Sequence, residues 1–223
     1  MRNNLHSFLS GLSLTVVTVA ISYFWLDRPL SYLAHNEFAQ WYGFHVMQRT
    51  PEFIEIAAAM VFALVAYRVL LRRPLSGLMH TLLLSAISLS VAKMIKDQLK
   101  FVFGRTWPET WVQNNPSLIR DGVYGFNFFH GGAGYAAFPS GHMTLICAVV
   151  AVFWLRIPSY RPLYAVIIAA VAISLIGANY HFFSDVVAGA FIGWCTGWLA
   201  TLIVDGDRPL PHQPAASASE YTR

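Results

Sequence analysis

Six long apolar stretches limit the folds open to this chain more than any other feature of its sequence. They cover about residues 8–26, 54–71, 75–95, 139–155, 162–179 and 185–204. Each has close to the roughly 20 residues with which a helix crosses about 30 Å of hydrocarbon. Because unpaired backbone groups are too costly in lipid, all six are expected to be helices. We therefore predict an all-α fold, an integral membrane bundle of six transmembrane helices.

The composition agrees with this fold and excludes an ordinary soluble domain. Hydrophobic residues make up 56% of the 223 residues and charged residues 12%, against roughly 45–50% and 25% in soluble domains. The net charge is +4, but the basic residues are scattered between apolar blocks, so nucleic acid is not an expected partner. The two cysteines lie in apolar runs and predict no disulfide framework.

The chain is predicted to hold one domain and a tail. Residues 1–204 form the transmembrane domain, and residues 205–223, which are rich in Pro, Ala and Ser, are expected to be a disordered cytoplasmic tail. The first apolar stretch could also be interpreted as a secretory signal peptide, but it is longer than the usual apolar core of one. Since Asp27-Arg28-Pro29 is not a small-residue cleavage site, we interpret the stretch as a retained span.

Basic residues in the short loops predict the orientation of the bundle, because cytoplasmic loops are enriched in Lys and Arg. One loop carries Arg68, Arg72 and Arg73, and another carries Arg156 and Arg161. Six spans place both loops and both termini on the same side, which is therefore the cytoplasmic side. The short loops are typical of a protein of the bacterial cytoplasmic (inner) membrane. The long connection at 96–138 then lies on the outer, periplasmic side.

Three separate segments place reactive side chains at this outer face. They are residues 100–108 after the third span, 139–142 at the start of the fourth, and 181–185 between the fifth and sixth. In the last segment, His181 and Asp185 are four residues apart, so that on a helix the carboxylate can orient the imidazole. Such a histidine can act as a nucleophile or a general base. The alternative is a purely structural pair that caps the sixth span.

The segment Pro139-Ser140-Gly141-His142 has the features of a helix start. Pro and Ser suit the first turn, and Gly141 lets a ligand approach the backbone closely. The free N–H groups of a helix N-terminus bind anions, and His142 stands beside them. The alternative is the plain start of a span.

Lys100 and Arg105 add fixed positive charge near these segments. Arg presents a planar fork that suits phosphate oxygens, and Lys presents a point charge. Both side chains are also common as interfacial anchors near span ends, which is the alternative interpretation. Together with the two histidines they predict a phosphoryl site that uses no metal and no cofactor. A metal site is less favoured because no ligand pair has close spacing, and a serine hydrolase is less favoured because Ser140 lacks a Gly-x-Ser-x-Gly context.

At these residues the sequence resembles the phosphatidic acid phosphatase type 2 superfamily, a membrane branch of the histidine phosphatases related to vanadium haloperoxidases. That family has three motifs: Lys, six residues, Arg-Pro; then Pro-Ser-Gly-His; then Ser-Arg, five residues, His, three residues, Asp. The second motif is complete here. The first and third motifs are represented by Lys100, Pro108, Ser174, His181 and Asp185.

Two arginines of the family pattern are absent. Trp107 stands where the first motif has Arg, and Leu175 follows Ser174 where the third has Arg. These arginines bind phosphate in the family, so we expect other groups to replace them. Arg105 is one candidate, and Asn179 could donate a neutral hydrogen bond. Lys96 is an alternative to Lys100.

The resemblance implies a function and a role for each matching residue. His181 would attack phosphorus and form a phosphohistidine, Asp185 would orient it, and His142 would protonate the leaving oxygen. The phosphate oxygens would be held by Lys100, Ser140 and the backbone of Gly141. The protein would be a lipid phosphatase that removes phosphate from a lipid phosphomonoester or diphosphate.

The resemblance leaves several substrates and functions open. The candidate substrates are phosphatidic acid, phosphatidylglycerol phosphate, polyprenyl diphosphate and phosphorylated lipid A. The other expected partners are membrane lipids. One alternative function is a phosphotransferase, in which a lipid instead of water accepts the phosphoryl group. Another is a catalytically weak relative that binds an anionic lipid or a protein partner. A transporter is less favoured because charge gathers at one face. The sequence predicts no particular oligomeric state.

Overall fold

A computed structural model describes residues 2–38, 44, 50–111 and 113–206. All regular elements in these ranges are helices, which confirms the all-α prediction. Five of them are long and apolar enough to cross a membrane, so the chain is a multi-pass membrane protein by length and composition. The sixth apolar helix, α7 (Gly141–Arg156), has 16 residues, which is short against the roughly 20 of a full span. Six spans were predicted, and five of the described helices reach spanning length.

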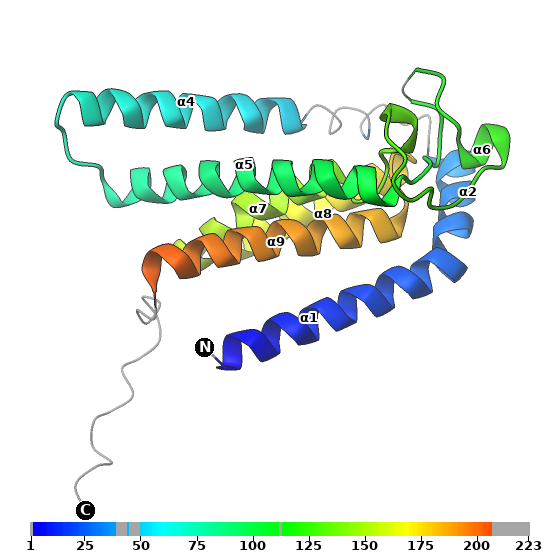
Figure 1. Cartoon of the computed structure of the whole chain (residues 1–223), viewed down its shortest axis with the longest axis horizontal. Helices are drawn as coiled ribbons and strands as arrows, with labels where there is room; N and C mark the ends of the chain where they lie inside the picture. Colours follow the sequence, from blue (N-terminus) through cyan, green and yellow to red (C-terminus); the bar gives the residue numbers. More distant parts are fainter. Residues whose placement is uncertain (1, 39–43, 45–49, 112, 207–223) are drawn as a thin grey trace, which may run out of the picture.

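The first half of the chain forms two arms. In the first arm α1 (Arg2–Ile21) continues through a π-helical turn (Ser22–Leu26) into α2 (Asp27–Glu37). The second arm is an antiparallel pair, α4 (Thr50–Leu70) and α5 (Gly77–Phe103) (Figure 1). The prediction ended the first span at residue 26, but the helix continues to residue 37. Pro29 lies in the first turn of α2, directly after the π-helical turn that joins α2 to α1.

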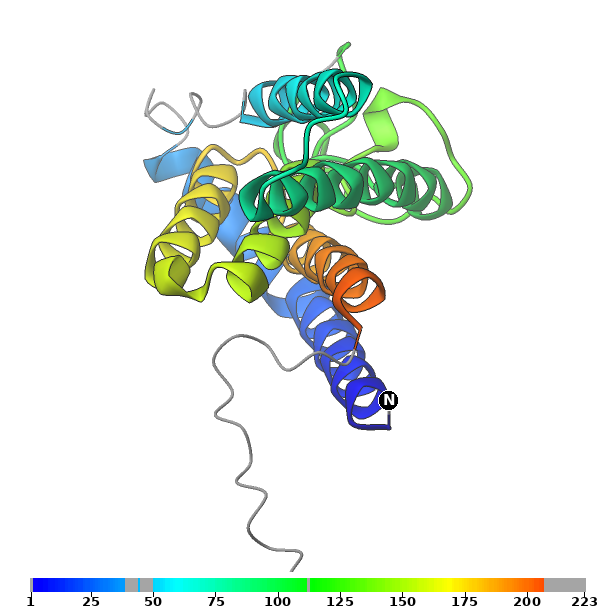
Figure 2. The ribbon, with the colours of Figure 1, turned by 90° about the vertical axis from the view of Figure 1, so that its left-hand side faces the viewer.

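The second half builds the centre of the bundle. A long connection with the short helix α6 (Leu118–Asp121) leads to α7, which is followed by α8 (Arg161–Gly177) and α9 (Phe183–Asp205). Helices α5, α7 and α9 lie at the centre, with α4 on one side and α1 on the other (Figures 1 and 2). The predicted tail at 205–223 falls outside the described residues apart from Asp205 and Gly206, at which α9 ends.

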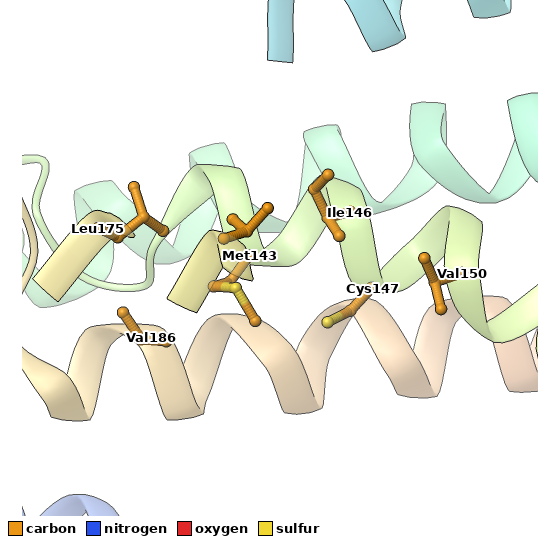
Figure 3. Close-up of a cluster of buried hydrophobic side chains, with 7 residues drawn as sticks. Met143, Ile146, Cys147, Val150, Leu175 and Val186 are labelled. Carbon is orange, nitrogen blue, oxygen red and sulfur yellow. The ribbon is translucent and has the colours of Figure 1, made fainter. Parts of the chain in front are cut away.

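A cluster of buried apolar side chains joins α7 to α8 and α9. Figure 3 shows four side chains spaced along α7, with Leu175 and Val186 on the two neighbouring helices. Leu175 is 1% exposed, so the residue that replaces the motif arginine is part of the hydrophobic core. The cluster consists of Met143, Ile146, Cys147, Val150, Val171, Leu175 and Val186.

Glycines at every fourth position bring α9 into backbone contact with α7. A Cβ on Gly189 would lie 2.5 Å from the Ser140 carbonyl oxygen, and one on Gly193 would lie 2.1 Å from the carbonyl oxygen of Thr144. Small residues permit this close approach, which is a usual way for helices to associate in membranes. The contact holds the starts of α7 and α9 together.

Gly104 turns the chain sharply after α5. Its φ of 52° is left-handed, and its N–H donates to the carbonyl of Lys100 at 2.9 Å. A Cβ there would lie 1.9 Å from the carbonyl oxygen of Asn127, so only glycine fits. The turn directs Arg105, which is fully buried, into the bundle.

Candidate active site

The three reactive segments meet at one end of the bundle. The last turn of α5 carries Lys100, the first turn of α7 carries His142, and His181 lies in the junction between α8 and α9. The N–H of Ser140 donates to the carbonyl oxygen of Asp185 at 3.0 Å. This bond links the start of α7 directly to the start of α9.

His181 and Asp185 form a buried pair, as expected from their four-residue spacing. The imidazole Nδ1 lies 3.5 Å from the carboxylate Oδ2. The same oxygen accepts a hydrogen bond from the backbone N–H of Phe182 at 3.0 Å, because Asp185 belongs to the first turn of α9. The positive end of the helix favours a carboxylate there. The carboxylate is thus anchored where it faces one ring nitrogen of the histidine.

The surroundings keep His181 neutral. Burial lowers the pKa of His181 well below its ordinary value, and the positive charges of Lys100 and Arg105 lower it further. A hydrogen bond with the backbone of Ala137 opposes this shift in the pKa of His181. The imidazole is therefore uncharged at neutral pH, and only this form has a lone pair for nucleophilic attack.

His142 lies opposite His181. The two ring centres are 6.1 Å apart, and the ring planes are inclined at 69°. Both rings also pack edge-on against Tyr180, at 5.3 Å for His142 and 5.2 Å for His181. The two imidazoles are therefore neighbours at the same end of the bundle, on either side of the Tyr180 ring.

Two lysines cover the N-terminus of α7. A Cβ on Gly141 would lie 3.4 Å from Cδ of Lys96 and 3.9 Å from Cε of Lys100. Ser140 begins the helix, and its hydroxyl oxygen accepts from the N–H of Met143 at 3.5 Å. The N–H groups of a first helical turn bind anions. The aliphatic parts of Lys96 and Lys100 therefore lie beside a helix start that favours an anion.

Each of the two lysines also has a partner within the protein. The ammonium of Lys100 donates to the carbonyl oxygen of Ala136 and lies 5.6 Å from the centre of the Trp107 ring. The ammonium of Lys96 pairs with Asp97, its neighbour in sequence.

Trp107 lines the site at the position where the first motif has arginine. Its ring centre lies 5.2 Å from that of His181 and 5.4 Å from that of Tyr180. The indole N–H donates to the carbonyl oxygen of Ala133 at 2.8 Å, which fixes the ring. An aromatic wall thus stands where the family pattern has a positive charge.

The structure gives Arg105 partners other than the phosphate expected from the sequence. One terminal nitrogen donates to Ser184 and Asp185, each at 2.5 Å. The other donates to Asp27 at 2.7 Å and to the hydroxyl of Tyr124 at 3.1 Å. Burial alone would lower the pKa of Arg105, but Asp185 and Asp27 hold it above its ordinary value. Arg105 is therefore a buried ion-pair partner of the carboxylate that faces His181.

Asn179 also has internal partners in place of the expected phosphate. Its amide nitrogen donates to Glu109 at 3.2 Å, and its amide oxygen accepts from the hydroxyl of Ser31 at 2.8 Å. Its backbone has a φ of 52°, which Asn tolerates better than most residues. Asn179 thus ties α2 and the long connection to the α8–α9 junction.

Sequence reasoning did not find Asp27, Ser184 or Tyr124, all of which contact the site through Arg105. One signal was available for Asp27: an acidic residue directly after a long apolar stretch needs a partner. Among the described residues, no three His, Cys, Asp or Glu side chains gather closely enough to hold a metal ion.

The chain is similar in sequence to known proteins. The model of the PAP2 superfamily matches residues 78–209, which include both histidines and Asp185. Lipid A 1-phosphatases of Rhizobium etli and Rhizobium johnstonii are 33% and 31% identical to this chain over 112 residues, 50% of its length. The match covers 44% and 42% of those two proteins, so this chain spans less than half the length of these curated relatives.

One solved structure is also similar. It is the crystal structure of a transmembrane PAP2 type phosphatidylglycerolphosphate phosphatase from Bacillus subtilis. Its sequence is 17% identical, the alignment covers 90% of this chain and 97% of the other, and the TM-score is 0.49.

Proposed function

The chain belongs to the PAP2 superfamily, and on this premise we propose that it is a membrane lipid phosphatase. In this proposal it removes a phosphate monoester or diphosphate group from a lipid, without a metal ion, through a phosphohistidine at His181. The observation that carries the proposal is the opposed pair of buried histidines, with ring centres 6.1 Å apart. One of them faces an anchored carboxylate, and the other begins a helix whose N-terminus is covered by two lysines.

In the first step, the neutral imidazole of His181 attacks phosphorus. A phosphorus–nitrogen bond forms as the bond from phosphorus to the lipid oxygen breaks, and His142 gives its proton to that oxygen. Asp185 stabilises the positive charge that develops on the His181 ring. In the second step, His142 takes a proton from water, the water oxygen attacks phosphorus, and inorganic phosphate leaves His181.

The phosphate oxygens are held at the N-terminus of α7. Lys96 and Lys100 supply two positive charges, and the N–H groups after Ser140 supply hydrogen bonds. Groups fixed in advance around a developing charge give the largest catalytic contribution in many enzymes. In this proposal the two lysines replace, as phosphate-binding groups, the arginines that are absent at Trp107 and Leu175.

The proposed membrane is the bacterial inner membrane, with both termini in the cytoplasm and the site on the periplasmic side. The support is the placement of basic residues at the end of the bundle remote from the site. Arg72 and Arg73 follow α4, while Arg156 ends α7 and Arg161 begins α8. Lys and Arg are enriched in the cytoplasmic loops of membrane proteins.

The proposal is tested by phosphate release from detergent-purified protein in excess chelator. The panel contains the 1-phosphate of lipid A, phosphatidic acid, phosphatidylglycerol phosphate and a polyprenyl diphosphate. The 1-phosphate of lipid A comes first, because two relatives are lipid A 1-phosphatases. We expect release that survives the chelator and is absent in His181→Ala. Release that needs metal, that persists in His181→Ala, or that is replaced by a phosphorylated lipid acceptor contradicts the proposal.

A further inference from the structure

A buried ion-pair network lies beside the two histidines, and of its residues only Asp185 takes part in the proposed chemical steps. Its centre is Arg105, whose side chain is fully buried between two equally buried carboxylates. One nitrogen contacts Asp185 Oδ1 at 2.5 Å, and the other contacts Asp27 Oδ2 at 2.7 Å. The network joins the start of α2, the turn after α5 and the start of α9.

Two hydroxyl groups complete the network. The N–H of Ser184 donates to Oδ1 of Asp27 at 3.0 Å, and its hydroxyl bridges Asp27 and Arg105. The hydroxyl of Tyr124 donates to the carbonyl oxygen of Tyr23 at 2.7 Å and contacts Asp27 Oδ2 at 3.2 Å. Asp27 is therefore held by bonds to three different segments of the chain.

The network determines which oxygen of Asp185 is presented to His181. Arg105 occupies Oδ1, while Oδ2 accepts from the N–H of Phe182 and lies 3.5 Å from the imidazole Nδ1. With both oxygens engaged, the carboxylate cannot rotate without losing a bond. Asp27 in turn holds the other half of the guanidinium fork, so the orientation of Asp185 depends on Asp27 as well.

Charged groups lie on several sides of His181. Two carboxylates face the Arg105 guanidinium, and the ammonium of Lys100 also interacts with Asp185. The charged or titratable groups that face the His181 ring are Lys100 from α5, Arg105 from the connection, His142 from α7, Tyr180 beside it and Asp185 from α9.

We propose that Asp27 and Arg105 are positioning residues that act through Asp185. They hold its carboxylate against His181. The effect of these residues on catalysis rests on the proposed function. The geometric and electrostatic effect on His181 is independent of which substrate the protein takes.

The test is to measure the pKa of His181 directly in the full-length protein. Protein labelled with ¹⁵N-histidine in detergent is titrated by NMR, with the His181 signal assigned by its loss in His181→Gln. Asp27→Asn removes a negative charge of the network, so the pKa of His181 should fall. Arg105→Gln removes the positive charge, so the pKa of His181 should rise by about one unit.

The two variants should shift the pKa of His181 in opposite directions, and this distinguishes a positioning role from a purely structural one. If the network only holds the fold together, both variants let water reach His181, and its pKa rises in both toward the ordinary value. A rise in Asp27→Asn, or no change in either variant, overturns the proposal. The matched control is Asp205→Asn, which breaks the Arg156–Asp205 pair at the other end of α7 and α9 and should leave His181 unchanged.

Activity supplies a second readout wherever the parent releases phosphate. Asp27→Asn should lower kcat by about 10–100-fold, as for other groups that orient a catalytic residue, with KM changed less than about threefold. A parent without activity contradicts the proposed function but leaves the NMR outcome valid. If Asp27→Asn does not fold, Ser184→Ala removes one bridging hydroxyl and should also lower kcat at constant KM. A raised KM at constant kcat would contradict the positioning role.

Discussion

The side chain of Lys96 lies across Gly141 at the start of α7. A methyl group on Gly141 would come within 3.4 Å of Cδ and 3.5 Å of Cε of this lysine. The lysine of the family motif, Lys100, lies farther along the same helix face, with its Cε at 3.9 Å. The side chains of two lysines thus pass beside the helix N-terminus, although the motif supplies only one.

Lys96→Met is expected to lower kcat/KM at least about tenfold, because a contact between charged groups contributes roughly 1.5–3 kcal/mol. The measurement is initial-rate kinetics on the best lipid of the panel. Lys93→Met is the matched control, since Lys93 lies one turn earlier on α5 and pairs with Glu55. Equal losses in the two variants would show that Lys96 has no special part in phosphate binding.

His142→Gln should impair the lipid substrate much more than an activated one. As a general acid, His142 contributes about 10²–10⁴-fold with a lipid alkoxide leaving group. With p-nitrophenyl phosphate the leaving group needs no proton, so the rate of the first step, measured as the burst of p-nitrophenol, should fall little. The second step uses His142 with either substrate, so the two substrates are compared on the first step alone. His80→Gln, an exposed histidine at the other end of α5, is the control. A loss of the same size on both substrates would contradict the acid role.

The stability of the protein should decrease in acid because of His181. Burial lowers its pKa in the folded state, so below about pH 6.5 the unfolded chain binds a proton that the folded chain excludes. The contribution is present above that pH and is lost as the pH falls toward the folded-state pKa of His181, at about 1.4 kcal/mol per pH unit. Apparent Tm in detergent should therefore fall less steeply with acid in His181→Gln than in the parent. Parallel curves would contradict the burial of a neutral His181.

Gly193→Ala should destabilise the bundle, because its Cβ would lie 2.1 Å from the carbonyl oxygen of Thr144. Overpacking of this kind costs about 1–3 kcal/mol, and it should lower the apparent Tm measured by tryptophan fluorescence. Gly77→Ala, at the start of α5, meets nothing within 4 Å and serves as the control. An unchanged Tm in Gly193→Ala would show that α7 and α9 do not depend on close backbone contact.

Local patterns in the sequence predicted the helices well. Hydropathy over about 20 residues is a local property, and the predicted sixth span at 185–204 matches α9, Phe183–Asp205, closely. The His181–Asp185 pair was also local, because four residues on one chain segment determined it.

The partners of Arg105 could not be predicted from local patterns in the sequence. Asp27 lies 78 residues away in sequence, and Asp185 lies 80 residues away on the other side. No periodicity links them, and the sharp turn at Gly104 that directs Arg105 inward depends on a contact with Asn127. The length of α2 was missed for a related reason: a proline after an apolar run indicates a stop, but here the helix continues past Pro29 to residue 37.

The central claim is that His181 carries the phosphoryl group, and trapping tests it most directly. Protein mixed with its lipid substrate is quenched in alkali, digested, and analysed by mass spectrometry under conditions that preserve phosphohistidine. The account predicts a phosphoryl group on the peptide that contains His181, absent from the same peptide of Asp185→Asn quenched equally early. Phosphate release with the phosphoryl group on another residue, or with none on the protein at any quench time, would contradict it.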